Sequence, residues 1–343
     1  MNFASDNITG AAPEILAAIE AANAGSLMPY GNDDVTRAAE AKVARVFETE
    51  ADVFFVATGT AANALALSAA TPPWGVIFCH SGAHINDTEG GAPEFFSGGA
   101  KLVTLQGADG KFTAGDLDAA IAGASVGNIH HAQPAAVSIT QATEAGTLYT
   151  LDEVAAIAGT CRRHGLKLHM DGARFANAVA ALGCSPAEAA WKAGVDMLSF
   201  GATKNGALTA EAVVLFDKDL ARDFAYRRKR GGHLFSKMRF LAVQWDAYVT
   251  GELWLDNARH ANAMTARMAD GLAAIDGCEL TRPVEANIAF PRLGAKVIEG
   301  LKADGFQFYE RGGENVIRLV CSFATTEEDV DAFLAAARKH AAG

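Results

Sequence analysis

Seven short runs of apolar residues alternate with helix-like segments in the first two thirds of this 343-residue chain. Each run is almost continuously apolar, which is typical of strands covered on both faces of a sheet. The runs occupy residues 53–56, 76–78, 102–105, 136–139, 166–169, 197–200 and 213–216. Because strands that alternate with helices usually form a parallel sheet between helical layers, the sequence predicts an α/β fold with a mostly parallel seven-stranded sheet.

The last third of the chain has a different pattern. It comprises a long helical stretch over residues 236–275, strand-like runs over 287–290 and 316–320, and a final helix capped by Thr325 or Thr326. We therefore predict a large domain over residues 1–248 and a small C-terminal α+β domain over residues 249–343.

The composition argues against several classes of protein. A net charge of −11 argues against a nucleic-acid-binding surface, and no run approaches the roughly 18 apolar residues of a membrane-spanning helix. The five cysteines form no CxxC pair, so the sequence predicts neither a disulfide framework nor a metal site. The N-terminus lacks a basic region followed by an apolar stretch, and we expect a cytoplasmic protein.

Asp171 and Lys204 each follow closely on one of the predicted strands, and both residues suit the same cofactor. A lysine can form a Schiff base with pyridoxal 5′-phosphate, and an acid can keep the pyridine nitrogen of that cofactor protonated. If each residue is considered alone, the ordinary interpretation is that Lys204 is a solvated surface lysine and that Asp171 caps a helix. Their occurrence together, at strand ends where open α/β sheets bind ligands, favours the cofactor site.

Further residues would complete such a site. Arg174 offers a planar fork that matches a carboxylate, although a surface salt bridge is the alternative. The turn at residues 58–61 joins a strand to a helix, and backbone N–H groups at a helix N-terminus favour a phosphate. His84 could stack on the cofactor ring and move protons, or it could be a structural histidine. Glu89 could be its partner or a solvated acid.

These motifs resemble those of a known family over essentially the whole chain. The family is the L-threonine aldolases of pyridoxal-phosphate fold type I, the aspartate-aminotransferase-like fold, and the low-specificity and phenylserine aldolases are the most similar. The resemblance lies in residues 3–7, 30–33, 59–63, 83–84, 169–174, 201–206 and 236–240. Two positions depart from the family pattern: Asn32 stands where aspartate is commoner, and residues 140–144 read TQATE where many relatives have a histidine.

The resemblance implies a role for each matching residue. It implies Lys204 as the Schiff-base lysine, Asp171 as the partner of the pyridine nitrogen, and His84 as the residue that stacks on the ring. The other cofactor-binding residues that it implies are Gly59, Thr60, Ala61, Arg174 and Arg228. The substrate-binding residues that it implies are Ser5, Arg174, Arg318 and, in the site of the neighbouring subunit, Tyr30. It also implies a homotetramer built from dimers that share active sites.

The function expected from this resemblance is the retro-aldol cleavage of L-threonine, L-allo-threonine and related L-β-hydroxy-α-amino acids, with phenylserine as a further candidate substrate. The products would be glycine and an aldehyde, and His84 or a water molecule would remove the β-hydroxyl proton. Because the same fold supports other reactions, a β-eliminating lyase or an aminotransferase is the alternative. A non-catalytic sensor or scaffold is a further alternative, but it would not need both Lys204 and Asp171.

Overall fold

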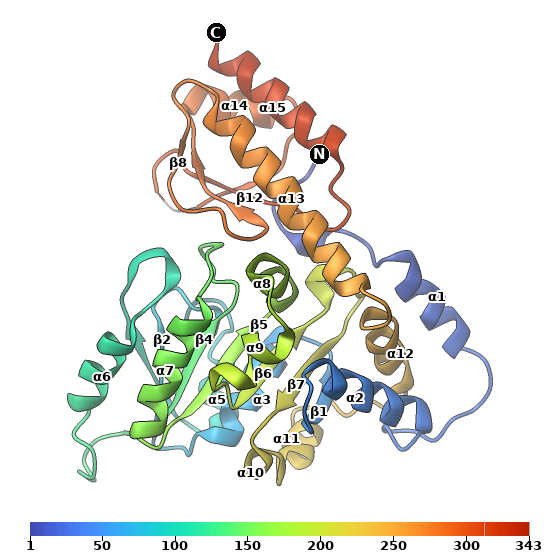
Figure 1. Cartoon of the computed structure of the whole chain (residues 1–343), viewed down its shortest axis with the longest axis vertical. Helices are drawn as coiled ribbons and strands as arrows, with labels where there is room; N and C mark the ends of the chain where they lie inside the picture. The colour runs from blue at the N-terminus through green and yellow to red at the C-terminus, as the bar shows by residue number, and fades with distance from the viewer. Residues whose placement is uncertain (312, 343) are drawn as a thin grey trace.

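A seven-stranded sheet forms the centre of the larger part of the molecule (Figure 1). The computed structural model describes residues 1–311 and 313–342, and the strands lie in the order β1-β7-β6-β5-β4-β2-β3. They are β1 (Asp52–Val56), β2 (Gly75–His80), β3 (Lys101–Leu105), β4 (Gln133–Thr140), β5 (Lys167–Gly172), β6 (Met197–Gly201) and β7 (Glu211–Leu215). Neighbouring strands are parallel except where β7 pairs with β1 and β6. The predicted mostly parallel seven-stranded sheet is confirmed.

Helices cover both faces of this sheet because successive residues of a strand point to opposite faces. On β7, Val213 and Leu215 pack with helix α3, whereas Val214 packs into the core on the other face. The α3 face carries α3 (Gly59–Ala70), α4 (His84–Asp87), α5 (Ala92–Ser97), α10 (Lys218–Ala221) and α11 (Phe224–Arg230). The other face carries α1 (Pro13–Ala22), α2 (Asp34–Val46), α6 (Ala114–Ala122), α7 (Leu151–Arg163), α8 (Phe175–Leu182), α9 (Pro186–Ala189) and α12 (Arg239–Tyr248).

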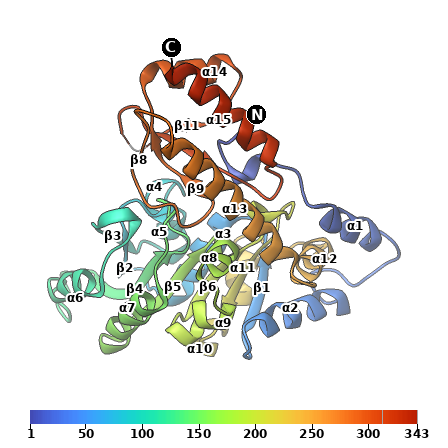
Figure 2. The ribbon, with the colours of Figure 1, turned by 45° about the horizontal axis from the view of Figure 1, so that its top comes forward.

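The smaller part of the molecule lies above the larger part in the view of Figure 1, and Figure 2 shows it turned forward. Helix α13 (Leu253–Ala273) begins beside α12 and extends into the smaller part, where α14 (Ala295–Ala303) and α15 (Glu327–Ala341) lie. The short strands there are β8 (Glu279–Leu280), β9 (Ile288–Ala289), β10 (Pro291–Arg292), β11 (Tyr309–Glu310) and β12 (Ile317–Val320). They pair as β11-β12-β9 and β10-β8, so the predicted α+β character of the C-terminal region is confirmed.

The helical stretch expected over residues 236–275 is two helices rather than one. Helix α12 ends at Tyr248 and α13 begins at Leu253, and Gly251 between them has a φ of +59°. This left-handed conformation interrupts a right-handed helix, and glycine adopts it without the steric cost that other residues meet. Thr326 caps α15 by accepting a hydrogen bond from the backbone N–H of Asp329, which confirms one of the two predicted caps.

The N-terminal residues pack with the smaller part. Phe3 is 1% exposed in the core of that part, where its ring meets Phe333 edge-on, and its backbone N–H donates to the carbonyl of Gln307 at 2.8 Å. The chain then continues through the short 3-10 helix η1 (Asp6–Ile8) toward α1. The first residues therefore lie where the two parts meet, and the division at residues 248 and 249 stays a prediction.

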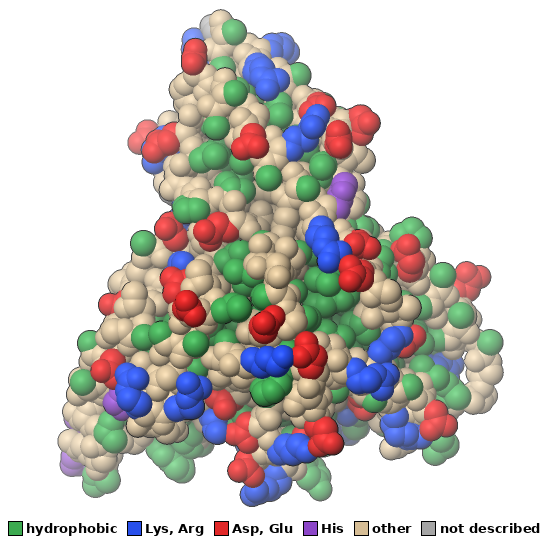
Figure 3. Space-filling model, in the orientation of Figure 1, with side chains coloured by type: hydrophobic (Ala, Val, Ile, Leu, Met, Phe, Trp, Pro, Cys, Tyr) green, Lys and Arg blue, Asp and Glu red, His purple; other side chains and the backbone are tan. Residues whose placement is uncertain are grey.

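The surface carries charged groups of both signs. On the face shown in Figure 3, Lys and Arg side chains are interspersed with Asp and Glu. Within residues 1–311 and 313–342, no helix is both long and apolar enough to span a membrane.

Candidate active site

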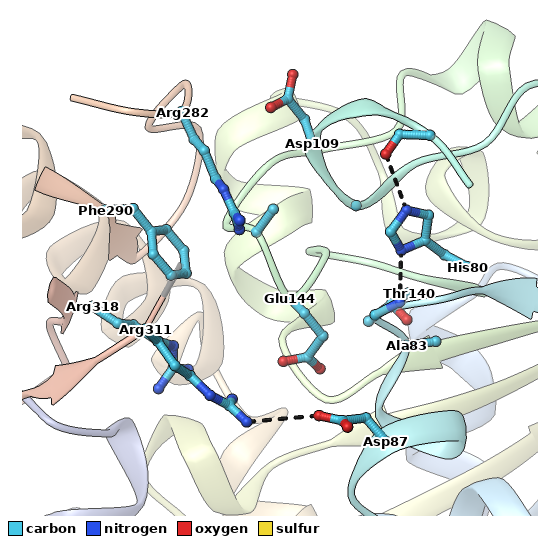
Figure 4. Close-up of a pocket in the computed structure, with 14 residues that line it drawn as sticks. His80, Ala83, Asp87, Asp109, Thr140, Glu144, Arg282, Phe290, Arg311 and Arg318 are labelled. Carbon is cyan, nitrogen blue, oxygen red and sulfur yellow. Dashed lines mark hydrogen bonds and ion pairs between the residues drawn. The ribbon is translucent and has the colours of Figure 1, made fainter. Parts of the chain in front are cut away.

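Three adjoining cavities lie between the carboxyl ends of the sheet strands and the smaller part. The inner cavity, about 380 Å³, is lined by the start of α3, Asp171 and Lys204. The arginine cavity, about 190 Å³, is lined by Arg174, Arg318 and again Lys204. The outer cavity, about 350 Å³, contains Phe290 and residues of both parts of the molecule, as Figure 4 shows. Because the cavities share lining residues, they form one continuous site.

Lys204 stands just after β6, at the end of the strand where open α/β sheets bind ligands. It lies in a short 3-10 helix, η4 (Thr203–Asn205), and Asn205 donates a hydrogen bond to the Tyr248 hydroxyl at 2.8 Å. Gly206 follows with a φ of +111°, a conformation that favours glycine. These features fix the backbone of Lys204, while its side chain lines both the inner and the arginine cavity.

Asp171 lies at the end of β5 and is 3% exposed. One carboxylate oxygen accepts a hydrogen bond from Asn63 Nδ2 at 2.8 Å, and the other accepts one from the Ala173 backbone N–H at 3.0 Å. Asn63 belongs to α3, the helix whose first turn forms another wall of the inner cavity. The two hydrogen bonds fix the direction of the carboxylate, and the structure brings Asp171 and Lys204 to the same cavity as predicted.

The start of α3 offers an anion-binding surface. Thr58 caps the helix by accepting a hydrogen bond from the Ala61 N–H at 3.2 Å, so Ala61 has given its N–H to the cap. Gly59 and Thr60 line the inner cavity, and a Cβ on Gly59 would meet no heavy atom within 4 Å. The first N–H groups of a helix lack partners within the helix and attract anions. The bare backbone at Gly59 therefore leaves space for a phosphate.

His84, the first residue of α4, is paired with a buried acid. Its Nδ1 lies 2.8 Å from Glu89 Oε1, and Glu89 is 7% exposed. Glu89 also accepts a hydrogen bond from Asn63 Nδ2 at 2.7 Å, which links it to Asp171. The hydrogen bond to Glu89 raises the pKa of His84, and the charges of Asp171 and Glu144 add to this effect, while burial opposes it. Glu89 is therefore the buried partner of His84 rather than a solvated acid.

Arg174 and Arg318 approach the arginine cavity from the two parts of the molecule. They are 4% and 8% exposed. Burial and the neighbouring charge of Arg174 together lower the pKa of Arg318 to about 10. Two guanidinium groups in one buried pocket are stabilised by an anion, and their planar forks match a carboxylate. The arginine cavity therefore has the positive charge that the predicted carboxylate-binding site requires.

Asp6 is a site residue that sequence reasoning missed. Its carboxylate accepts hydrogen bonds from Arg174 Nε at 2.7 Å, Arg174 Nη2 at 3.0 Å and Asn287 Nδ2 at 3.0 Å. Burial alone would raise the pKa of Asp6, but the charges of Arg174 and Lys204 outweigh burial and lower it. Because Asp6 occupies the Nε–Nη2 edge of Arg174, Nη1 and the second N–H of Nη2 are left for a ligand. The only sequence signal for Asp6 is its place in the N-terminal motif.

Two further acids were also missed. Glu211 begins β7, lines the inner cavity and is 7% exposed, and burial raises its pKa to about 7. Glu144 lies on the turn after β4 and lines all three cavities. The sequence signal for Glu144 is that it stands in the TQATE segment that departs from the family pattern.

The remaining predicted residues lie in different places. Ser5 lines the arginine cavity, where its hydroxyl accepts a hydrogen bond from the Asn7 N–H at 3.2 Å. Tyr30 is 44% exposed, with Lys229 Nζ 4.9 Å from its ring centroid. Arg228 is buried and packs over the ring of Phe54 in β1. Within the described part of the chain, neither Tyr30 nor Arg228 lines any of the three cavities.

The inner cavity fits pyridoxal 5′-phosphate. It combines an amine, an acid, an aromatic ring and a helix N-terminus around one space. Asn63 Oδ1 is buried at this cavity without a hydrogen-bond partner among the described residues. Such an unpaired polar atom costs about 1–3 kcal/mol, so a polar ligand that reaches it is favoured. Within residues 1–311 and 313–342, no group of three His, Cys, Asp or Glu side chains is placed to hold a metal ion.

Comparisons with known proteins agree with this geometry. A family model described as beta-eliminating lyase matches residues 2–294. The chain is 48% identical to a low specificity L-threonine aldolase of Pseudomonas aeruginosa, over 96% of this chain and 94% of that protein. It is 45% identical to a low specificity L-threonine aldolase of a Pseudomonas species, over the same shares of the two chains. The structure is similar to that of a Leishmania major threonine aldolase, with a TM-score of 0.93, 30% identity and 99% of each chain covered.

Proposed function

The chain belongs to the L-threonine aldolases of the beta-eliminating lyase family, and we propose that it cleaves L-threonine and related L-β-hydroxy-α-amino acids into glycine and an aldehyde. Enzymes of this family use pyridoxal 5′-phosphate, and the fold is pyridoxal-phosphate fold type I, as predicted. The observation that carries the proposal is the meeting of Lys204, Asp171 and a buried arginine pair at adjoining cavities.

The inner cavity would hold the cofactor. When bound, pyridoxal 5′-phosphate withdraws electrons from the bonds of the substrate α-carbon. Lys204 would attach it through the side-chain amine, and Asp171 would keep a proton on the ring nitrogen. Gly59 and Thr60 would bind the phosphate at the start of α3, where the first N–H groups of the helix lack partners within the helix. His84 would cover the ring.

The arginine cavity would hold the substrate carboxylate. Arg318 and the free Nη1 of Arg174 would bind its two oxygens, and Ser5 would border them. Only a bond perpendicular to the cofactor ring overlaps the π-system. The orientation in which the two arginines hold the carboxylate would therefore determine which bond of the α-carbon breaks. Loss of either arginine should therefore lower the rate as well as the affinity, because orientation is part of the barrier.

His84 suits the role of a proton donor. Its Nδ1 is held by Glu89, which leaves Nε2 free. The raised pKa of His84 increases the share of rings that carry protons on both nitrogens, and a ring in that form donates at Nε2 rather than accepts. A donor at this place would steady the substrate hydroxyl, whereas removal of the hydroxyl proton calls for an acceptor. The expected base role of His84 stays a prediction.

The proposed substrate range includes L-allo-threonine and phenylserine. The outer cavity, about 350 Å³, is lined by Phe290, Ala83 and Ala145 beside charged residues, and it offers room for a large β-substituent. A β-eliminating lyase or an aminotransferase would use the same cofactor site but would release ammonia or a keto acid. The identity of the products therefore separates these reactions.

We also propose that two subunits share their active sites. Tyr30, which the family resemblance places in the neighbouring site, is exposed and lies outside the cavities of its own chain. Leu27, Met28 and Leu208 are also exposed, at 45%, 66% and 55%. A second copy of the chain that covered these side chains would remove apolar surface from water. The tetramer and the cytoplasmic location stay predictions.

Absorbance spectra and product analysis test the proposed reaction. The protein reconstituted with pyridoxal 5′-phosphate should show the absorbance band of lysine-bound cofactor, and Lys204→Ala should lack it. L-Threonine should yield acetaldehyde and glycine in equal amounts. Lys296→Ala, on the exposed side of α14, is the control and should keep both properties. A keto acid or ammonia in place of acetaldehyde would replace the aldolase reaction by the alternative, and failure to bind the cofactor would refute both.

A further inference from the structure

Glu144 occupies a position to which the proposed function gives no role. Within residues 1–311 and 313–342, it is the one residue that lines the inner, the arginine and the outer cavity. Figure 4 shows its side chain pointing into the outer cavity, toward the space between Arg311 and Asp87. Its carboxylate therefore stands at the junction of the whole site.

A substrate bound in this site must place its amino group, its carboxylate and its β-carbon in three different directions. Its amino group belongs at the cofactor beside Lys204, in the inner cavity. Its carboxylate belongs with Arg174 and Arg318, in the arginine cavity. The β-carbon is then left to extend toward the outer cavity, which adjoins both. The β-hydroxyl consequently lies near the junction of the three cavities. Glu144 is the side chain that lines all three of them.

The turn that carries Glu144 is held from both sides. Gln141 Nε2 donates to the Tyr149 carbonyl at 2.8 Å, and the Tyr149 N–H donates to Gln141 Oε1 at 3.0 Å. Inside the turn, the Thr143 and Thr147 hydroxyls are 2.7 Å apart, and the Thr143 N–H donates to the Thr147 carbonyl at 2.9 Å. A side chain on so fixed a backbone is positioned before the substrate arrives, which is what efficient catalysis requires.

The carboxylate of Glu144 remains available to a ligand. Charge attraction acts between it and His84, Arg174 and Arg318, but no hydrogen bond joins it to any of these three described side chains. Its lone pairs are therefore free of these neighbours. His84, by contrast, is committed to Glu89 through Nδ1, and its ring offers a donor to the hydroxyl when both nitrogens carry protons.

We propose that Glu144 is a catalytic residue that accepts the proton of the substrate β-hydroxyl during carbon–carbon cleavage. The O–H bond breaks, its electron pair forms the carbonyl of the leaving aldehyde, and the proton passes to a Glu144 oxygen. The electron pair of the broken Cα–Cβ bond stays on the α-carbon, where the bound cofactor stabilises it. The α-carbon then takes up one proton to give glycine, and Glu144 returns its proton to solvent. This inference rests on the proposed function and supplies its base.

A comparison of two reactions of the cofactor-loaded enzyme tests the proposal. Cleavage of L-threonine needs the β-hydroxyl proton removed, whereas exchange of the glycine α-proton in D₂O, followed by NMR, involves no hydroxyl. Glu144→Gln should lower kcat for cleavage by about 10²- to 10³-fold, the size of a general-base contribution. It should leave the glycine exchange rate, the dissociation constant of glycine by calorimetry and the absorbance spectrum of the cofactor close to those of the parent.

Glu299→Gln is the matched control, because it makes the same change of side chain on the exposed side of α14, where Glu299 lines none of the three cavities. It should keep cleavage and glycine exchange close to the parent rates.

Three results would overturn the proposal, and one of them concerns the reaction itself. Equal losses of cleavage and exchange in Glu144→Gln would make Glu144 a general binding residue. Undiminished cleavage in Glu144→Gln, with cleavage lost in His84→Asn, would make His84 the acceptor. If the parent enzyme exchanges the α-proton of glycine but releases no aldehyde from L-threonine, the proposed function is refuted. This result comes from the parent enzyme and does not depend on the Glu144 variant.

Discussion

The Asp6–Arg174 pair joins the first residues of the chain to the centre of the site. The two side chains are 2% and 4% exposed and meet through two hydrogen bonds, at 2.7 and 3.0 Å. Removing two charges from water is costly, and the bidentate contact offsets that cost only while both partners are present. The orientation of Arg174 in the arginine cavity thus depends on Asp6.

The substitution Asp6→Asn should destabilise the protein strongly. It leaves the Arg174 charge buried without compensation, and breaking a buried pair in this way typically costs about 3–5 kcal/mol. Asp331→Asn is the control, because Asp331 makes a similar bidentate contact with Arg267 on the exposed surface, where such a pair contributes about 1 kcal/mol or less. Urea unfolding measures both free energies. Equal losses in the two variants would contradict the assignment.

Local pattern reveals some of the site residues and hides others. Lys204 and Asp171 could be predicted because each follows an apolar strand, and that relation is contained in neighbouring residues. Asp6 could not, because its partner Arg174 is 168 positions away and only the meeting of the two parts brings them together. Asn63 was missed for the same reason, since its contact with Asp171 depends on how α3 packs on the sheet.

At the scale of elements, the direction of β7 determines which of its residues reaches the site. Strand β7 is antiparallel to both neighbours, so its first residue lies at the edge where the parallel strands end. That residue is Glu211, paired in register with Gly201 of β6. An apolar run predicts a strand but not its direction, so the sequence predicted the sheet and missed this buried acid. Similarly, helical periodicity predicted residues 236–275 as one stretch but not the turn that separates α12 from α13.

The buried Glu211 should make stability depend on pH. Burial raises its pKa to about 7 from an ordinary value of 4.5, so the folded state binds the proton more tightly than the unfolded state does. Its contribution to stability therefore falls as pH rises through this window, by about 3 kcal/mol in all. Glu211→Gln should be more stable than the parent at pH 8, and the gain should be about 2 kcal/mol smaller at pH 5.5.

Chemical unfolding at these two pH values, at matched cofactor loading, measures the effect of Glu211→Gln. The control is Glu299→Gln on the exposed side of α14, where the carboxylate is solvated in both states. A difference between Glu211→Gln and its parent that is the same at both pH values would show that Glu211 titrates alike in the folded and unfolded chain.

At the scale of the whole molecule, the site exists only where the two parts of the chain meet. Arg318 comes from the smaller part and Arg174 from the larger, and Arg311 of the smaller part lies 3.7 Å from Asp87 of α4 across the outer cavity. Tyr30, in contrast, lies outside the cavities of its own chain and is exposed. We therefore propose that its predicted role near the substrate is fulfilled in another copy of the chain.

Mixed subunits test whether Tyr30 serves a neighbouring site. Lys204→Ala and Tyr30→Ala should each have little aldolase activity alone, because one lacks the cofactor-binding amine and the other the residue lent to its partner. When the two variants are unfolded and refolded together in equal amounts, half of the dimers should be mixed. Each mixed dimer should hold one intact site out of two. About one quarter of the parent activity should therefore return. Lys204→Ala refolded with Lys204→Ala,Tyr30→Ala is the control and should recover none. If the first mixture stays inactive although native mass spectrometry shows mixed dimers, Tyr30 acts within its own chain or not at all.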